Sequence, residues 1–129
     1  MPVVRSIIAL VGGYAIMVLV LVVLVAIAAW TLHVSSGAPS QPFLLARLVS
    51  SGVAAIAGGY STATLAPVRP RAHAVGLGVM ILATSMSTVS HSTQGQPAWN
   101  AVAVVVIGPL FAILGGLLRQ PRLPSPVPT

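Results

Sequence analysis

Four long apolar runs, separated by short polar segments, set the pattern of this sequence. They cover residues 7–30, 43–66, 72–90 and 98–118. Arg47, in the second run, is the one charged residue within these four runs. The hydrocarbon core of a bilayer requires about 20 apolar residues per helix. The runs are continuous, whereas barrel strands show short alternating segments. The pattern therefore predicts an all-α, polytopic membrane protein with four transmembrane helices.

The segments between the runs predict how the helices are connected. Residues 34–42, 67–71 and 91–97 are short and rich in proline, glycine and serine. Short connections place successive helices antiparallel, which predicts an up-down four-helix bundle and a single domain over residues 1–118. Residues 119–129 contain four prolines, so we expect a disordered tail there.

The arginines predict the orientation, because positive residues flanking membrane helices stay on the cytoplasmic side. Five of the six fall on one side of the predicted bundle: Arg5, Arg69, Arg71, Arg119 and Arg122. Both termini are therefore predicted to be cytoplasmic, in a multi-pass protein of the cell inner membrane. Trp30 and Trp99 lie at the opposite boundary, as expected of an interfacial aromatic belt.

The composition narrows the possible chemistry. The 129 residues are 57% hydrophobic, with a formal net charge of +6 and no Asp, Glu or Cys. Carboxylate acid–base catalysis, thiol chemistry and acidic metal sites are thereby excluded, so we expect neither an enzyme nor a metal site. The arginines are dispersed between apolar runs rather than clustered on one face, which argues against nucleic-acid binding.

Small residues are concentrated in the predicted cytoplasmic half. Glycine doublets occur in three of the four runs, and the second run has rows of small residues at four-residue spacing. Such rows allow close packing of helices in lipid, either within the chain or against another subunit or a flat cofactor. The candidate partner or lipid contacts in the second run are Arg47, Ser51, Ala55, Gly58 and Gly59.

Arg47 needs a counter-charge that no side chain of this protein supplies, because the sequence has no Asp or Glu. Its partner is a lipid phosphate reached by snorkelling, or an acidic group of a partner subunit or ligand.

Hydroxyl residues are dense in the outer half of the third run, at Thr84, Ser85, Ser87 and Thr88. Hydroxyls in membrane helices bond to carbonyls of their own helix or to neighbouring helices. The alternative interpretation is a polar pocket that opens toward the outer side.

Three histidines are candidate cofactor ligands. His73 and His91 lie at opposite ends of the third run, and His33 follows the first run, on the same side as His91. Axial ligation of haem or chlorophyll is one interpretation. The other is that all three histidines lie at the membrane interface without a cofactor.

Several segments together resemble a group of small bacterial proteins. They are an arginine before the first run, the motif GGY-x-x-x-x-LAP from Gly58 to Pro67, and a glycine doublet followed by Arg119. The pattern is similar to uncharacterised small four-helix inner-membrane proteins of bacteria, which implies the fold and the compartment. Small multidrug resistance transporters also have four helices, but they depend on a glutamate in their first helix, and the first run here has none.

We therefore expect a non-catalytic integral membrane protein that acts as an accessory or assembly subunit of a larger respiratory or photosynthetic complex. Its expected partners are the lipid bilayer and other membrane subunits. One alternative is a small transporter or channel that uses the hydroxyl-lined outer pocket. The other is a carrier of haem or pigment through its histidines.

Overall fold

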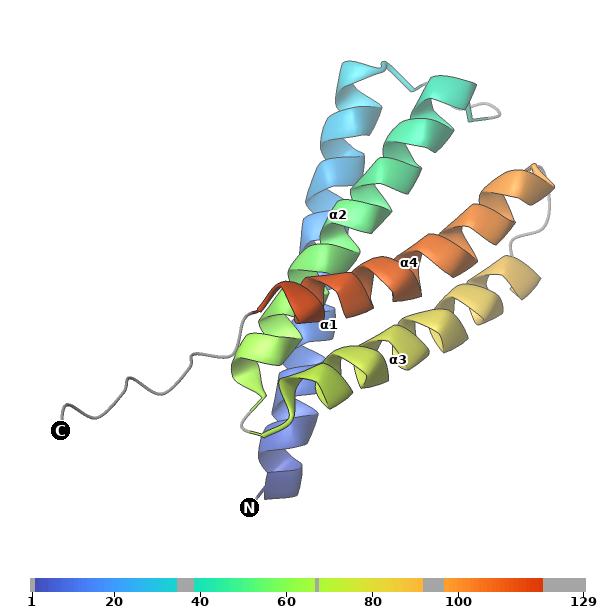
Figure 1. Ribbon diagram of the computed structural model, residues 1–129. Coiled ribbons are helices and arrows are strands. Elements are labelled where there is room, and N and C mark those ends of the chain that lie inside the picture. The colour runs from blue at the N-terminus through green and yellow to red at the C-terminus, as the bar shows by residue number, and fades with distance from the viewer. Residues whose placement is uncertain (1, 35–38, 67, 92–96, 120–129) are drawn as a thin grey trace, which may run out of the picture.

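The computed structural model describes residues 2–34, 39–66, 68–91 and 97–119, which form four helices (Figure 1). The bounds are α1 (Pro2–Thr31), α2 (Gln41–Leu65), α3 (Pro70–His91) and α4 (Ala98–Leu118). Each helix is long and apolar enough to cross a membrane, and the four pack as a bundle. The all-α, multi-pass membrane fold predicted from the sequence is therefore confirmed. The predicted disordered tail, apart from Arg119, lies outside the described residues.

Proline stands at or next to the start of every helix. Pro2 and Pro70 are the first residues of α1 and α3, Pro42 occupies the first turn of α2, and Pro97 precedes α4. A residue at a helix start has no intrahelical partner for its N–H, and the fixed φ of proline already suits the helix. The prolines of the short connections thus mark where the helices begin.

The four helices are arranged around α2. It packs along α1 on one side and α4 on the other, and α3 packs mainly on α4. Figure 1 shows the pair α1–α2 and the pair α3–α4 close together at one end and diverging toward the other. The narrow end holds the start of α1 and the end of α4, and the wide end holds the end of α1 and the start of α4. By the arginine pattern, the wide end is predicted to face outward.

Small residues hold the narrow end together. A Cβ added to Gly58 would lie 2.7 Å from the Cβ of Met17 in α1, and one added to Gly59 would overlap with the backbone of Ala112 in α4. Gly116 of α4 meets Ala74 of α3 in the same way. Backbones that approach this closely leave no room for a side chain, as expected of helix pairs packed in lipid. The predicted close packing of this half is present within the chain itself.

The outer surface of the bundle is apolar. Large hydrophobic side chains of all four helices are exposed, including Leu19, Val49, Val79 and Leu110. In water such a surface would cause aggregation, whereas lipid is the matching solvent. The surface composition thus agrees with a chain embedded in a bilayer.

Candidate functional site

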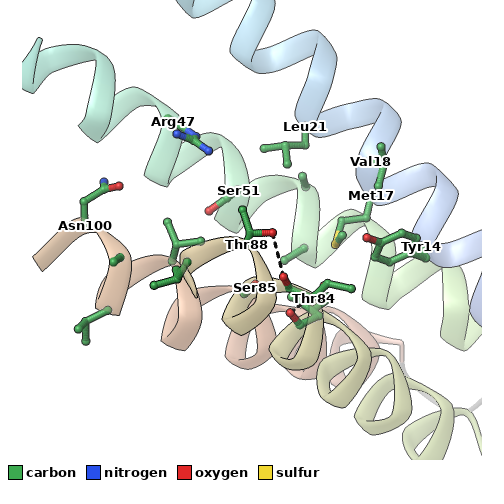
Figure 2. A pocket seen from close by; sticks show the side chains of 18 of the residues that line it. Tyr14, Met17, Val18, Leu21, Arg47, Ser51, Thr84, Ser85, Thr88 and Asn100 are labelled. Carbon is green, nitrogen blue, oxygen red and sulfur yellow. Dashed lines mark hydrogen bonds between the residues drawn. The ribbon is translucent and has the colours of Figure 1, made fainter. Parts of the chain in front are cut away.

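A cleft of about 600 Å³ lies between the diverging helix pairs, and all four helices contribute to it (Figure 2). Its polar lining comes from Tyr14 of α1, Arg47 and Ser51 of α2, Thr84, Ser85 and Thr88 of α3, and Asn100 of α4. Its apolar lining includes Met17, Val18, Leu21, Ala54, Ala55, Ile81, Val102, Val104 and Gly108. The cleft is therefore mostly hydrophobic, with a small group of polar residues.

The polar groups gather toward the wide end. At 1.5 Å per residue, Arg47, Asn100 and Thr88 lie within about 10 Å of the wide-end termini of their helices. Ile81 and Gly108 lie deeper, about 15 Å from those termini. Figure 2 shows the same order, from Asn100 and Arg47 on the left to Met17 and Tyr14 on the right. Arg47 and Asn100 thus lie toward the mouth, and the deeper lining is mostly apolar apart from Ser51 and the Tyr14 hydroxyl.

Asn100 is the most unusual residue of the cleft. Only 1% of its surface is exposed, and its side-chain nitrogen Nδ2 is buried without a hydrogen-bond partner among the described residues. Leaving a buried donor unpaired costs about 1–3 kcal/mol. Such donors are normally paired in native proteins, by protein groups, by water or by a ligand. Asn100 therefore marks the mouth of the cleft as a candidate binding site.

Three of the hydroxyl groups on the walls are already used as donors. Thr84, Thr88 and Ser51 donate to carbonyl oxygens of their own helices at distances of 2.9–3.0 Å. Each oxygen keeps a lone pair, which makes it an acceptor toward the cleft. The hydroxyls of Thr84 and Thr88 thus bond to their own helix, as the first interpretation predicted, and they also border the cleft.

Arg47 brings the positive charge into the cleft. Its side chain is half-buried, and none of the described residues forms a hydrogen bond or an ion pair with it. The chain has no Asp or Glu that would neutralise it. Arg47 and Asn100 together make the mouth of the cleft rich in unpaired donors, which favours an acceptor or an anion as the bound group.

The structure brings together most, but not all, of the residues singled out in the sequence. Arg47, Ser51, Ala55, Thr84, Ser85 and Thr88 line one cleft. Ser87 is exposed and does not line it. Gly58 and Gly59 are buried at the narrow end, where they contact α1 and α4 of the same chain. The small-residue faces of α2 are thus occupied by the protein's own helices.

The histidines do not meet. His33 and His91 are both exposed, and the ends of α1 and α3 that carry them diverge in Figure 1. The His73 Nδ1 atom lies 3.1 Å from the Arg69 carbonyl oxygen. None of the three lines the cleft, and no group of three His, Cys, Asp or Glu residues in the described part of the chain could hold a metal ion.

His33 has a structural role that sequence reasoning did not anticipate. Its φ is +48°, its N–H donates to the Trp30 carbonyl, and the N–H of Val34 donates to the Ala29 carbonyl. This pair of bonds around a left-handed residue is the Schellman motif that ends many helices. His33 therefore terminates α1.

Asn100 was also not anticipated. The signal was present, because it is an amide within the first turn of an otherwise apolar run. An amide so close to a membrane boundary is compatible with exposure to headgroups and water. Only the packing of α4 on its neighbours shows that Asn100 is buried.

Comparison with protein-family models, curated proteins and solved structures found no match. No family is thus identified, and the structure shows the coarser feature of that resemblance: its described residues form four helices, each a candidate membrane span.

Proposed function

We propose that this protein is a small, non-catalytic membrane transporter that binds its solute in the cleft between the helix pairs. Small-molecule sites are typically concave and apolar, have volumes of about 300–1,000 Å³, and contain a few polar groups that orient the ligand. The cleft has this volume and this lining. The observation that carries the proposal is the unpaired, buried Nδ2 of Asn100.

A transporter fits the geometry better than a channel. A channel conducts through a continuous pore, whereas here the narrow end is filled by backbone contacts such as those of Gly59 with Ala112 and Gly115 with Ile56. Open access at one end and closure at the other correspond to one state of an alternating-access cycle. The two helix pairs are the units whose relative movement would expose the cleft to the other side.

Cysteine accessibility tests the proposal, because the natural chain contains no Cys. Ser85→Cys places a thiol in the cleft, and Met86→Cys places one at nearly the same depth on the exposed face of α3, where Met86 is 57% exposed. Both variants are reconstituted in sealed liposomes and treated with a membrane-impermeant thiol reagent. We expect Ser85→Cys to react and Met86→Cys to resist, since a thiol in hydrocarbon does not form the reactive thiolate.

Transport itself is measured as uptake of candidate solutes into the same liposomes. A Thr84→Val, Thr88→Val double variant removes two hydroxyls of the cleft, and Ser87→Ala removes an exposed hydroxyl of the same helix as the matched control. The double variant should lose uptake while the control retains it. A cleft thiol that resists the reagent from both sides of the membrane would refute the proposal.

An accessory subunit of a larger membrane complex is the second candidate, and a shallower groove favours it. The groove lies between α1 and α2, is lined by Leu21, Val22, Val25, Ala26, Ala29 and Phe43, and has Arg47 at its border. A partner helix with an acidic residue would both cover this groove and neutralise Arg47. Co-purification in mild detergent tests the role of an accessory subunit. Arg47→Gln should lose partner proteins that Arg5→Gln retains. Recovery of identical partners with both variants would exclude the accessory role.

A further inference from the structure

We infer that the ligand of the cleft is an amphipathic anion with one alkyl chain, whose acid group lies between Arg47 and Asn100. The inference rests on the proposed binding role of the cleft and specifies its ligand. The alkyl chain extends from the mouth toward Ile81, Met17 and Gly108. The shared chemistry is an acid group at the end of an alkyl chain, whether a carboxylate or a phosphate.

The sign of the ligand's charge follows from the groups that are left unpaired. Arg47 is a permanent cation, and Asn100 Nδ2 is a donor without a partner among the described residues. No carboxylate is available in the sequence to bind a cationic solute. An acid group therefore satisfies both unpaired donors, and charge-assisted hydrogen bonds are among the strongest that a protein makes.

The opposite wall determines where the acid group lies. Thr84 and Thr88 of α3 have already donated their protons to backbone carbonyls, so their oxygens face the cleft as acceptors. An anion is repelled by these lone pairs and attracted by Arg47 and Asn100. The acid group is thus placed against α2 and α4 rather than against α3.

The depth of the cleft sets the length of the alkyl chain. Along α3 and α4 the polar residues of the lining lie within about 10 Å of the wide-end termini, and Ile81 and Gly108 line it at about 15 Å. This is half of the roughly 30 Å hydrocarbon core, which is the length occupied by the acyl chains of one leaflet. A ligand with its acid group at the interface would therefore extend its chain to about the middle of the bilayer.

Protection of Ser85→Cys from the small neutral reagent iodoacetamide tests the inference. The protein is placed in liposomes of zwitterionic lipid, and three probes with the same oleoyl chain are added separately: oleate, oleoyl lysophosphatidic acid and the uncharged 1-oleoylglycerol. We expect at least one acidic probe to slow the labelling about tenfold and the uncharged probe to leave it nearly unchanged. Protection by only oleate identifies a carboxylate ligand, and protection by only the lysophosphatidic acid identifies a phosphate.

Two variants connect the protection to the proposed contacts. Arg47→Gln and Asn100→Leu should each weaken the binding of the acidic probe about tenfold or more, whereas Arg5→Gln, at the narrow end, should not. Helix content measured by circular dichroism verifies that each variant is folded. Met86→Cys, labelled in parallel in the presence of each probe, corrects for any general effect on the bilayer.

The outcomes separate the inference from the proposed function. Equal protection by all three probes, or protection that survives both Arg47→Gln and Asn100→Leu, would overturn the anionic ligand and leave the binding role intact. Absence of protection by any probe, with the thiol reactive, would also overturn it. A Ser85→Cys thiol that never reacts, even without probes, would instead contradict the proposed function.

Discussion

Gly59 of α2 faces Ala112 of α4 so closely that a Cβ on Gly59 would overlap with the Ala112 carbonyl oxygen. Nearby, Gly115 makes the same kind of approach to the backbone of Ile56. These contacts join the two helix pairs at the narrow end, and the cleft begins where such contacts stop. The binding cleft and the glycine packing are therefore two consequences of one helix arrangement.

Gly59→Ala should destabilise the protein, because the neighbouring group is backbone and cannot move aside as a flexible side chain would. We expect a loss of about 1–3 kcal/mol, the usual range for overpacking a tight contact. Gly76→Ala is the matched control, since its Cβ would lie an ordinary 3.5 Å from the Leu10 Cδ2 atom. Thermal unfolding of both variants in the same detergent measures the difference. Equal melting temperatures would show that the two helix pairs are not joined through Gly59.

Asn100→Leu should leave the ligand-free protein as stable as before, or more stable by about 1–2 kcal/mol. The reason is that leucine has a similar size and removes a buried donor that has no partner. Thr62→Val is the contrasting variant, because the buried Thr62 hydroxyl donates to the Gly58 carbonyl at 2.9 Å and its loss removes a bond that is made. Unfolding in detergent compares the two. A clear loss of stability for Asn100→Leu would assign Asn100 a structural role in place of ligand binding.

His33→Gly should stabilise the end of α1. His33 has a φ of +48°, and a left-handed backbone costs a residue with a Cβ roughly 1–2 kcal/mol that glycine avoids. We expect a small rise in melting temperature and no change in the visible absorption spectrum after incubation with haemin. A haem spectrum that depends on His33 would instead favour the cofactor-carrier alternative.

The orientation predicted from the arginines is open to a direct test. Ser40 lies just before α2 at the wide end, and Val68 lies between α2 and α3 at the narrow end. Both residues are exposed, and each is replaced by cysteine in a separate variant. In intact cells an impermeant thiol reagent should label Ser40→Cys alone, and Val68→Cys should react only after the membrane is opened. The reverse pattern would mean that the cleft opens toward the cytoplasm.

The sequence alone determined the architecture of this protein. Runs of about 20 apolar residues can satisfy their backbone groups in lipid only as helices, and the short connections leave few ways to arrange them. The hydroxyls of Thr84, Ser85 and Thr88 and the isolated charge of Arg47 were also recognisable from their positions, because polar groups in such runs are costly.

Only the tertiary structure decided which residues share a site. Helix packing in lipid has no strong hydrophobic driving force, so the neighbours of each helix are chosen by local fit between small residues. That fit places α2 between α1 and α4, and the divergence of the two helix pairs opens the cleft. It also buries Asn100, whose Nδ2 has no hydrogen-bond partner in the part of the chain that the structure describes, and leaves Ser87 outside the cleft lining. These outcomes depend on contacts between residues that are distant in the chain, and hydropathy along the sequence does not encode them.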